Sequence, residues 1–446
     1  MITLTPYSII TSSLHDFKAI ARRALQALHG SCASPMLRAL MSTEKPKLRE
    51  DLQPVRASMD GRDVILLRDP LVLSSQVLAL GAGAVGMLGL LDGTRDVPEL
   101  RLLAIQARGG TLEAGDDLEN LLGILDERCL LENGHYREAR RVIIEDWASQ
   151  TDRPAAFSGA AYPADGSQLS RFLEEILGNA PEPHQQLPGG RLVGIMAPHV
   201  DIQKGWPLYG AAYGTLRRSA TEPDRILLLG TGHTMGEGLL CPTTKHYATP
   251  LGRTSTDVDL AIALSDACGG ALDDLPHKGE HSLEFQVIFL QHVFAEKIPP
   301  LVPVLCGDAG SLLARASRPS GLPGVGAALE LMREAVGGAG LVLAGVDLVH
   351  VGPKFGDADP ASSILSDALE HESALLDALE SADAESFWSE AAKVEDRYNV
   401  CGLSSLGVLL ETLPDGSRGV LLGRDVMREH DTNSAVGFAA MAFFAP

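Results

Sequence analysis

The 446-residue sequence lacks the features of a secreted or membrane protein. Its six cysteines show no paired spacing, which argues against a disulfide-stabilised fold and favours reduced thiols in the cytoplasm. They are Cys32, Cys129, Cys241, Cys268, Cys306 and Cys401. No window of about 20 residues is apolar and free of charge, so we predict no membrane-spanning helix. The first apolar stretch carries charges and no small-residue cleavage site follows it, so we predict no secretory signal.

The sequence also lacks positive charge. It has 37 Lys and Arg against 58 Asp and Glu, a formal net charge of −21. Because a nucleic-acid partner requires clustered cations, this balance argues against one. The apolar fraction of 45%, with 46 Gly and 26 Pro, is typical of a folded α/β protein. A chain of this length exceeds one ordinary core, so two or more domains are expected.

The N-terminal part begins with an ill-defined segment. Residues 1–57 are interpreted as a leader of undefined order, with one amphipathic helix predicted near 15–29. From about Asp60 the pattern becomes regular: the strand-like run RDVILLRDP precedes an apolar helix that ends at the turn Asp92-Gly93. A small folded domain is therefore predicted to start near residue 58.

Two further helices complete this small domain. Asp96 in LLDGTRDVPEL is typical of a helix start. The next helix carries four leucines at the spacing of one helical face: Leu118, Leu121, Leu122 and Leu125. An apolar helix, this turn and a helix closing on LLGILDERCLLE resemble, in that order, the PqqD-like fold over residues 58–140. The resemblance implies a winged-helix-like domain that recognises a peptide ligand.

The C-terminal part, from Arg191 onward, alternates strand-like and helical stretches. The apolar runs are LVGIMA, RILLLGT, PLVPVLC and LVLAGVD, and SAVGFAAMAFF is predicted to be the last strand. Helices are predicted at 257–267, 283–294 and 325–336. Continuous apolar strands separated by helices predict an α/β fold, with a mostly parallel sheet and helices flanking both faces.

Histidines follow three of these strands. LVGIMA leads into His199, RILLLGT into His233, and LVLAGVD into Asp347 and then His350. In an open α/β sheet, ligands bind beyond the carboxyl ends of the strands. Each histidine taken singly has an ordinary explanation as a hydrogen-bonded loop residue. Their joint occurrence at three strand ends favours a functional site.

Cys401 is the least ordinary of the cysteines. It stands in RYNVCGLSSLGVLLE, just before a predicted helix. A helix N-terminus lowers the pKa of a thiol and favours the thiolate that a metal requires. Imidazole and thiolate together suit Fe, Zn or Cu, whereas Mg and Ca prefer oxygen ligands. Asp347 is expected to complete such a site or to orient a histidine from behind.

Five motifs carry a family resemblance. APHVDIQKGWPLYGAAY, LLLGTGHTMG, HKGEHSLEFQVIFLQ, AGVDLVHVG and NVCG resemble, in order and spacing, successive motifs of the Memo family, of the type called AmmeMemoRadiSam system protein B. RPAAFSGAAYPAD resembles the first segment of that family's domain, so the resemblance covers residues 153–446. It implies a fold similar to the class III extradiol ring-cleaving dioxygenases, which use non-haem Fe(II).

The resemblance also implies roles for individual residues. The metal ligands fall on His199, His233 and Cys401, with Fe(II) or Cu as the expected metal and Zn as a further option. The residues implied for catalysis in the same pocket are Asp347, His350 and His281, with His281 as a proton carrier. The chain departs from the family's pattern at Val200-Asp201-Ile202 and at Val346, so the substrate side of the pocket is expected to differ.

Two other motifs are set aside. Residues Gly81–Gly86 match the dinucleotide-binding fingerprint. The helix predicted after them ends at a chain reversal after about two helical turns, which is too short for the crossover between parallel strands that this fingerprint requires. His277 and His281 are four residues apart, as in zinc proteases. Gly279 lies between them and Ser282 is predicted to cap the next helix, so we expect the pair on a loop.

Three functions follow from these observations. The first is a metal-dependent oxidoreductase related to the extradiol dioxygenases, in which His281 or His350 moves protons. The second is a binding or scaffold protein that acts with a radical SAM enzyme and an AMMECR-type protein, partners which the family name implies, and that recognises a peptide through residues 58–140. The third is a hydrolase with Cys401 as nucleophile.

Overall fold

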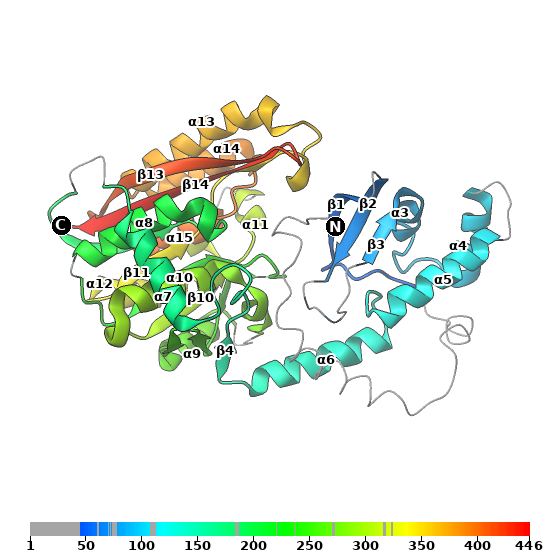
Figure 1. Cartoon of the computed structure of the whole chain (residues 1–446), viewed down its shortest axis with the longest axis horizontal. Coiled ribbons are helices and arrows are strands. Elements are labelled where there is room, and N and C mark those ends of the chain that lie inside the picture. The colour runs from blue at the N-terminus through cyan, green and yellow to red at the C-terminus, as the bar shows by residue number, and fades with distance from the viewer. Residues whose placement is uncertain are drawn as a thin grey trace. The chain divides into compact units, whose positions relative to one another are not determined.

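The computed structural model describes residues 45–59, 62–69, 71, 73, 78–107, 113–182, 187–219, 221–236, 238–269, 273–314, 318–322 and 324–446. These residues form two compact units, one up to Ser149 and one from Gln150 to Pro446 (Figure 1). The helix predicted near residues 15–29 lies outside the described residues.

The N-terminal unit contains a three-stranded antiparallel sheet in the order β1-β2-β3. Its strands are β1 (Gln53–Met59), β2 (Arg62–Arg68) and β3 (Leu78–Gly81). Its helices are α3 (Ala82–Leu88), α4 (Val97–Ala107), α5 (Glu113–Glu127) and α6 (Gly134–Ser149). Because β1 pairs along its whole length with β2, the folded unit takes in residues before position 58.

A leucine-rich core holds the N-terminal unit together. Leu100, Leu118 and Leu125 are fully buried in it, which confirms the predicted leucine face of α5. The predicted start of α4 is also confirmed. Asp96 accepts the Glu99 backbone N–H at 2.9 Å, and the Glu99 carboxylate accepts the Asp96 N–H at 3.0 Å. This reciprocal pair is a capping box, which satisfies two amides that the helix itself leaves free.

The C-terminal unit is built on an eight-stranded mixed sheet. Four adjacent strands at its centre, in the order β5-β11-β6-β10, are parallel. They are β5 (Arg191–Ala197), β11 (Leu341–Gly345), β6 (Ile226–Thr231) and β10 (Leu301–Cys306). The remaining four pair antiparallel: β7 (Leu240–Pro242), β12 (His350–Val351), β13 (Arg418–Glu429) and β14 (Ser434–Ala445). The parallel arrangement predicted for the sheet is therefore confined to its centre.

Helices cover both faces of this sheet, which divides two apolar cores (Figure 1). Along β6 the side chains alternate between them: Leu227 and Leu229 enter one core and Leu228 enters the other, as the pleat of a strand requires. The helices are α7 (Gly166–Gly178), α8 (Ile202–Ser219), α9 (Val258–Ala267), α10 (His281–Phe294), α11 (Gly310–Ala314), α12 (Val325–Gly337), α13 (Ala361–Glu380), α14 (Ala384–Val394) and α15 (Leu403–Thr412). The predicted helices at 257–267, 283–294 and 325–336 correspond to α9, α10 and α12.

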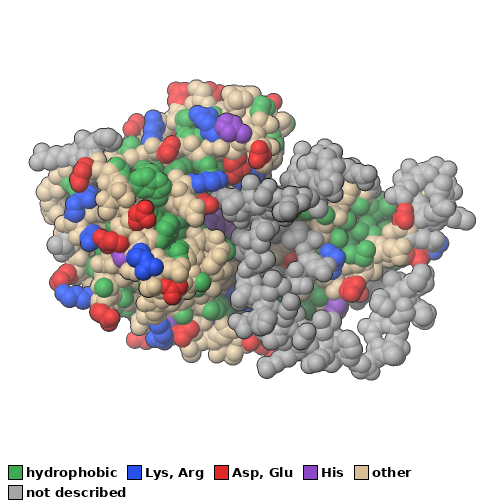
Figure 2. Space-filling model, viewed as in Figure 1, with side chains coloured by type: hydrophobic (Ala, Val, Ile, Leu, Met, Phe, Trp, Pro, Cys, Tyr) green, Lys and Arg blue, Asp and Glu red, His purple; other side chains and the backbone are tan. Residues whose placement is uncertain are grey.

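Three short strands lie outside the main sheet, and one is important for the site. β4 (Asp152–Pro154) pairs with β8 (His246–Thr249), which pairs with β9 (Gly252–Thr254). On the face shown in Figure 2, acidic and basic side chains are interspersed over the C-terminal unit. Within the described residues, no helix combines the length and the apolarity needed to cross a membrane.

One carboxyl group is buried between α13 and the sheet. Glu372 of α13 is fully buried, and neither of its oxygens has a hydrogen-bond partner among the described residues. It faces Gly437 of β14, where any side chain would overlap the carboxyl group. Burial raises the pKa of Glu372 to about 7. The protonated form is therefore the one that this position accommodates.

This carboxyl group predicts a pH-dependent stability. Between about pH 4.5 and 7 the folded chain holds a proton that the unfolded chain has released, so stability falls as pH rises through that window. Glu372→Gln removes the buried charge and should gain stability relative to the native chain from pH 5 to pH 8, by up to about 3 kcal/mol. Urea unfolding at each pH measures the difference. Glu370→Gln, at an exposed position of the same helix, is the control, and an equal response of both variants would contradict the assignment.

Candidate metal centre

Three neighbouring strands end at the same edge of the sheet. β5 is followed by His199, β6 by His233, and β11, which lies between them, by Asp347. Because these strands are parallel, their carboxyl ends meet at one edge. The convergence predicted from the strand ends is thus present in the fold.

Cys401 reaches this edge through a short docked segment. The Cys401 N–H donates to the Leu348 carbonyl at 3.1 Å, and the Gly402 N–H donates to the Asp347 carbonyl at 2.9 Å. A Cβ at Gly402 would come within 2.5 Å of the Val346 Cβ, so this close approach requires glycine. The loop after β11 and the start of α15 are therefore fixed against each other.

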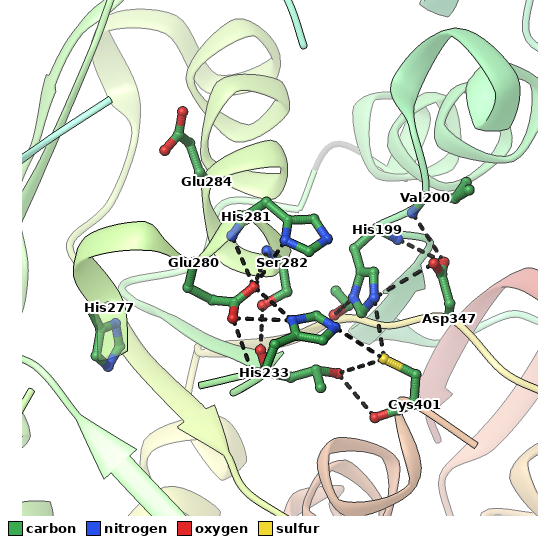
Figure 3. A network of polar contacts seen from close by, with 12 residues as sticks. His199, Val200, His233, His277, Glu280, His281, Ser282, Glu284, Asp347 and Cys401 are labelled. Atoms are coloured by element: carbon green, nitrogen blue, oxygen red, sulfur yellow. Dashed lines mark hydrogen bonds and ion pairs between the residues drawn. The ribbon is translucent and has the colours of Figure 1, made fainter. Parts of the chain in front are cut away.

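The Cys401 sulfur lies between two imidazoles (Figure 3). Its distance is 3.3 Å to His199 Nε2 and 3.4 Å to His233 Nε2. The carboxylate of Asp347 lies 3.5 Å from His199 Nε2 and also accepts the His199 backbone N–H at 2.9 Å. The structure therefore brings together four of the residues predicted for the site from distant parts of the chain.

The opposite nitrogen of each ring fixes its orientation. His199 Nδ1 lies 3.0 Å from the Gly345 carbonyl, and His233 Nδ1 lies 3.0 Å from Glu280 Oε1. A carbonyl or carboxylate oxygen accepts hydrogen bonds only, so Nδ1 carries the proton in both rings. Both Nε2 atoms consequently face the sulfur of Cys401.

Glu280 is a site residue that the sequence analysis missed. Its buried carboxylate accepts the backbone N–H groups of His233, His281 and Ser282 at 3.1, 2.8 and 2.9 Å. It caps α10, so the predicted cap at Ser282 is wrong and the helix starts at His281. The available signal was an acidic residue directly before His281-Ser282, at the place where a helix N-terminus favours a negative charge.

His281 joins the cluster from the first turn of α10. Its ring stacks on that of His233, with centroids 4.9 Å apart and planes 17° apart, and lies 5.1 Å from that of His199. One potential ligand atom from each of these three histidines lies within 4.8 Å of the other two. The rings of Phe157 and Phe285 pack edge-on against His281. The expectation that His281 lies on a loop is therefore wrong.

His277 and His350 have other partners. His277 belongs to the short 3-10 helix η2 (Leu275–Gly279) and lies 2.8 Å from the Cys241 carbonyl, so it does not share a helix with His281. His350 Nδ1 lies 2.8 Å from the Leu348 carbonyl, and its ring packs on Phe355. Within the described residues, none of the hydrogen bonds or ring contacts of the His350 side chain involves the cluster.

The side chains of the cluster shift one another's pKa values. Burial opposes ionisation of Cys401, but the imidazoles of His199 and His233 hold the pKa of its thiol well below the ordinary value. Burial likewise opposes protonation of His199, but Asp347 and Cys401 raise the pKa of this imidazole to about 9. Burial lowers the pKa of His281 and favours its neutral form. The site therefore offers a thiolate beside imidazoles, a donor set that suits Fe, Cu or Zn.

A buried ion pair supports the turn that carries Glu280. Arg153 of β4 is fully buried and pairs with the equally buried Glu284 of α10. Its guanidinium donates to the His277 carbonyl at 3.0 Å and to the Glu280 carbonyl at 2.7 Å. Glu284 also accepts the Phe157 N–H at 2.9 Å. β4 thereby braces the residues that orient His233 and His281.

Comparison with known proteins identifies the family of this chain. A family model described as Memo-like protein matches residues 153–442. The chain belongs to the Memo family. A MEMO1 family protein of Aquifex aeolicus is 29% identical over 406 residues, 90% of this chain and 100% of that protein. One of Methanopyrus kandleri is 31% identical over 306 residues, 66% of this chain and 99% of that protein. One of Thermus thermophilus is 27% identical over 333 residues, 74% of this chain and 94% of that protein.

These proportions separate two kinds of Memo relative. The Aquifex match covers more of this chain than residues 153–442, so it extends into the N-terminal unit. The Methanopyrus protein matches 66% of this chain over nearly its own full length. That share of this chain is close to the share that the Memo-like family model covers. The C-terminal unit is thus the part on which Memo membership rests.

Breaking the Arg153–Glu284 ion pair should lower the free energy of unfolding of the C-terminal unit far more than breaking an ion pair at the surface. Arg153→Met leaves a buried carboxylate without its partner, which costs about 3–5 kcal/mol. Arg217→Met removes the exposed pair with Glu174 and should cost about 1 kcal/mol or less. Urea unfolding of both variants gives the comparison, and similar small losses would show that Arg153 does not brace the site.

Proposed function

We propose that this Memo family protein is a cytoplasmic metal-dependent oxidoreductase that holds one Fe or Cu ion through His199, His233 and Cys401. The observation that carries the proposal is the meeting of one sulfur and two ring nitrogens at 3.3 and 3.4 Å. Donor atoms bound to one four-coordinate metal, at about 2.0 Å for nitrogen and 2.3 Å for sulfur, lie about 3.5 Å apart. The three side chains therefore fit such an ion with little movement.

The surrounding residues have distinct tasks in this proposal. Gly345 and Glu280 hold the Nδ1 protons of the two ligand histidines and direct Nε2 to the metal position, as the hydrogen-bond partners of metal-binding histidines do. Asp347 lies beside His199 Nε2 and keeps the loop that carries this histidine in place. When bound, the metal would supply a redox-active position for O₂ or substrate.

The chemistry should differ from that of the extradiol dioxygenases which the fold is proposed to resemble. Non-haem Fe(II) oxygenases bind their metal through two histidines and one carboxylate. Here Cys401 takes the third position, and a thiolate donates more electron density than a carboxylate. Ring cleavage therefore does not follow from the likeness, and the reaction class is kept at metal-dependent oxidation or reduction.

Removing the thiolate should empty the site. Protein purified anaerobically should contain close to one metal ion per chain, and Cys401→Ser should retain less than a tenth of it, because an alcohol is a far weaker ligand than a thiolate. Element-resolved mass spectrometry measures the content. Cys268→Ser, at an exposed cysteine, should keep the full amount. Trace metal in the native protein would refute the proposal.

Changing the orienting carboxylate should weaken the site without removing a ligand. Glu280→Gln keeps the shape of the side chain but removes the charge that holds His233 Nδ1. Metal affinity should fall about 10- to 100-fold, the usual cost of losing such a partner. Competition with a chromophoric chelator measures this, with the exposed Glu174→Gln as control. An unchanged affinity in Glu280→Gln would contradict the role of Glu280.

A second candidate function concerns the N-terminal unit. It forms a compact unit with its own leucine core, outside the Memo-like match. This favours a separate task, and we propose peptide recognition of the PqqD-like kind, in association with a radical SAM enzyme or an AMMECR-type protein. The full chain should then retain such a partner in pull-down from native extracts, whereas residues 150–446 should not. Equal retention by both would rule out this task for the N-terminal unit.

A further inference from the structure

We propose that His281 is a direct fourth ligand of the metal, so that the donor set is three imidazoles and one thiolate. The inference rests on the proposed metal site and replaces the proton-carrying role expected for His281 from the sequence. It starts from the position of this ring. One potential ligand atom each from His199, His233 and His281 lies within 4.8 Å of the other two.

That spacing is close to what coordination requires. In a four-coordinate site, two nitrogens bound to one metal at about 2.1 Å lie about 3.4 Å apart, so the ring nitrogens need to close by at most about 1.4 Å. The three imidazoles are therefore within a small side-chain adjustment of sharing an ion. Figure 3 shows one ring nitrogen of His281 directed to Glu280 and the other on the side of His199. The free nitrogen of His281 is thus available to the cluster.

The same carboxylate serves two rings. Glu280 Oε1 lies 3.0 Å from His233 Nδ1 and 3.2 Å from His281 Nδ1. A carboxylate that accepts the Nδ1 proton of a histidine orients its Nε2 for a metal. Because one carboxylate holds both Nδ1 positions, Glu280 orients the ring of His281 in the same way as that of the ligand His233. A histidine that only packed at the rim of the pocket would not need this support.

The aromatic neighbours restrain the ring of His281. The ring centroids of Phe157 and Phe285 lie 5.6 and 5.4 Å from that of His281, and both rings pack edge-to-face against the imidazole. Such packing limits rotation of the imidazole. A side chain that is held in this way before the metal arrives is a preorganised ligand. His292 on the same helix contrasts with it, since its Nε2 lies 2.9 Å from the surface carboxylate of Glu174.

Cobalt substitution of the full chain tests the fourth ligand. Co(II) protein should show the intense visible bands of a four-coordinate site and a sulfur-to-metal charge-transfer band. In His281→Asn the charge-transfer band should remain, because Cys401 is intact. The visible bands should lose at least about half their intensity as water enters, and the Zn(II) dissociation constant should rise about tenfold or more. His292→Asn should match the native protein, and Cys401→Ser should lose the charge-transfer band.

X-ray absorption of the unmutated chain loaded with Zn(II) gives an answer that needs no variant. Three histidine nitrogens and one sulfur in the first shell would support the proposal, and two nitrogens and one sulfur would overturn it. A native-like spectrum and Zn(II) affinity in His281→Asn would also overturn it, while leaving the three-ligand site standing. Failure of the native protein to bind either Co(II) or Zn(II) would remove both the site and its fourth ligand.

Discussion

The site depends on the hydrogen bonds that the buried carboxylate of Glu280 accepts. Burying a carboxylate is costly unless hydrogen bonds compensate it, and here three backbone amides and an imidazole do so. The same bonds join the loop after β6 to the first turn of α10. Two parts of the chain that are 47 residues apart are thereby locked together. His233 and His281 owe their relative position to this one side chain.

Charge balance explains why such a cluster suits a cation. Glu280, Asp347 and a thiolate at Cys401 place three negative groups in a largely buried space. Without a metal, protons on His199 and His233 compensate them, which is why the pKa values of both imidazoles lie above the ordinary value although burial opposes this. A divalent metal ion between the imidazoles and the thiolate would replace the positive charge of those protons. Metal binding is therefore expected to release protons and to couple to stability.

The sequence predicted the parts of the site that follow from strand and helix periodicity. Apolar runs located β5, β6 and β11, and the residues directly after them delivered His199, His233 and Asp347 to one edge. It did not predict Arg153, because its partner Glu284 is 131 residues away and no local pattern links them. Two of the antiparallel strands were missed for a related reason: β7 and β12 are only three and two residues long, too short for a period to be visible.

The position of His281 decides what the centre can do. A site with three protein ligands keeps a coordination position open for O₂ or substrate, whereas a fourth imidazole closes it in the manner of structural zinc sites. Of the three histidines, His199 is buried, whereas the side chains of His233 and His281 each keep about a third of their surface exposed. A ligand at the exposed side can be displaced without opening the core. In the proposed centre, His199 would therefore be the least accessible histidine, His233 and His281 would lie at the exposed side, and the bound metal would supply its redox chemistry at that side.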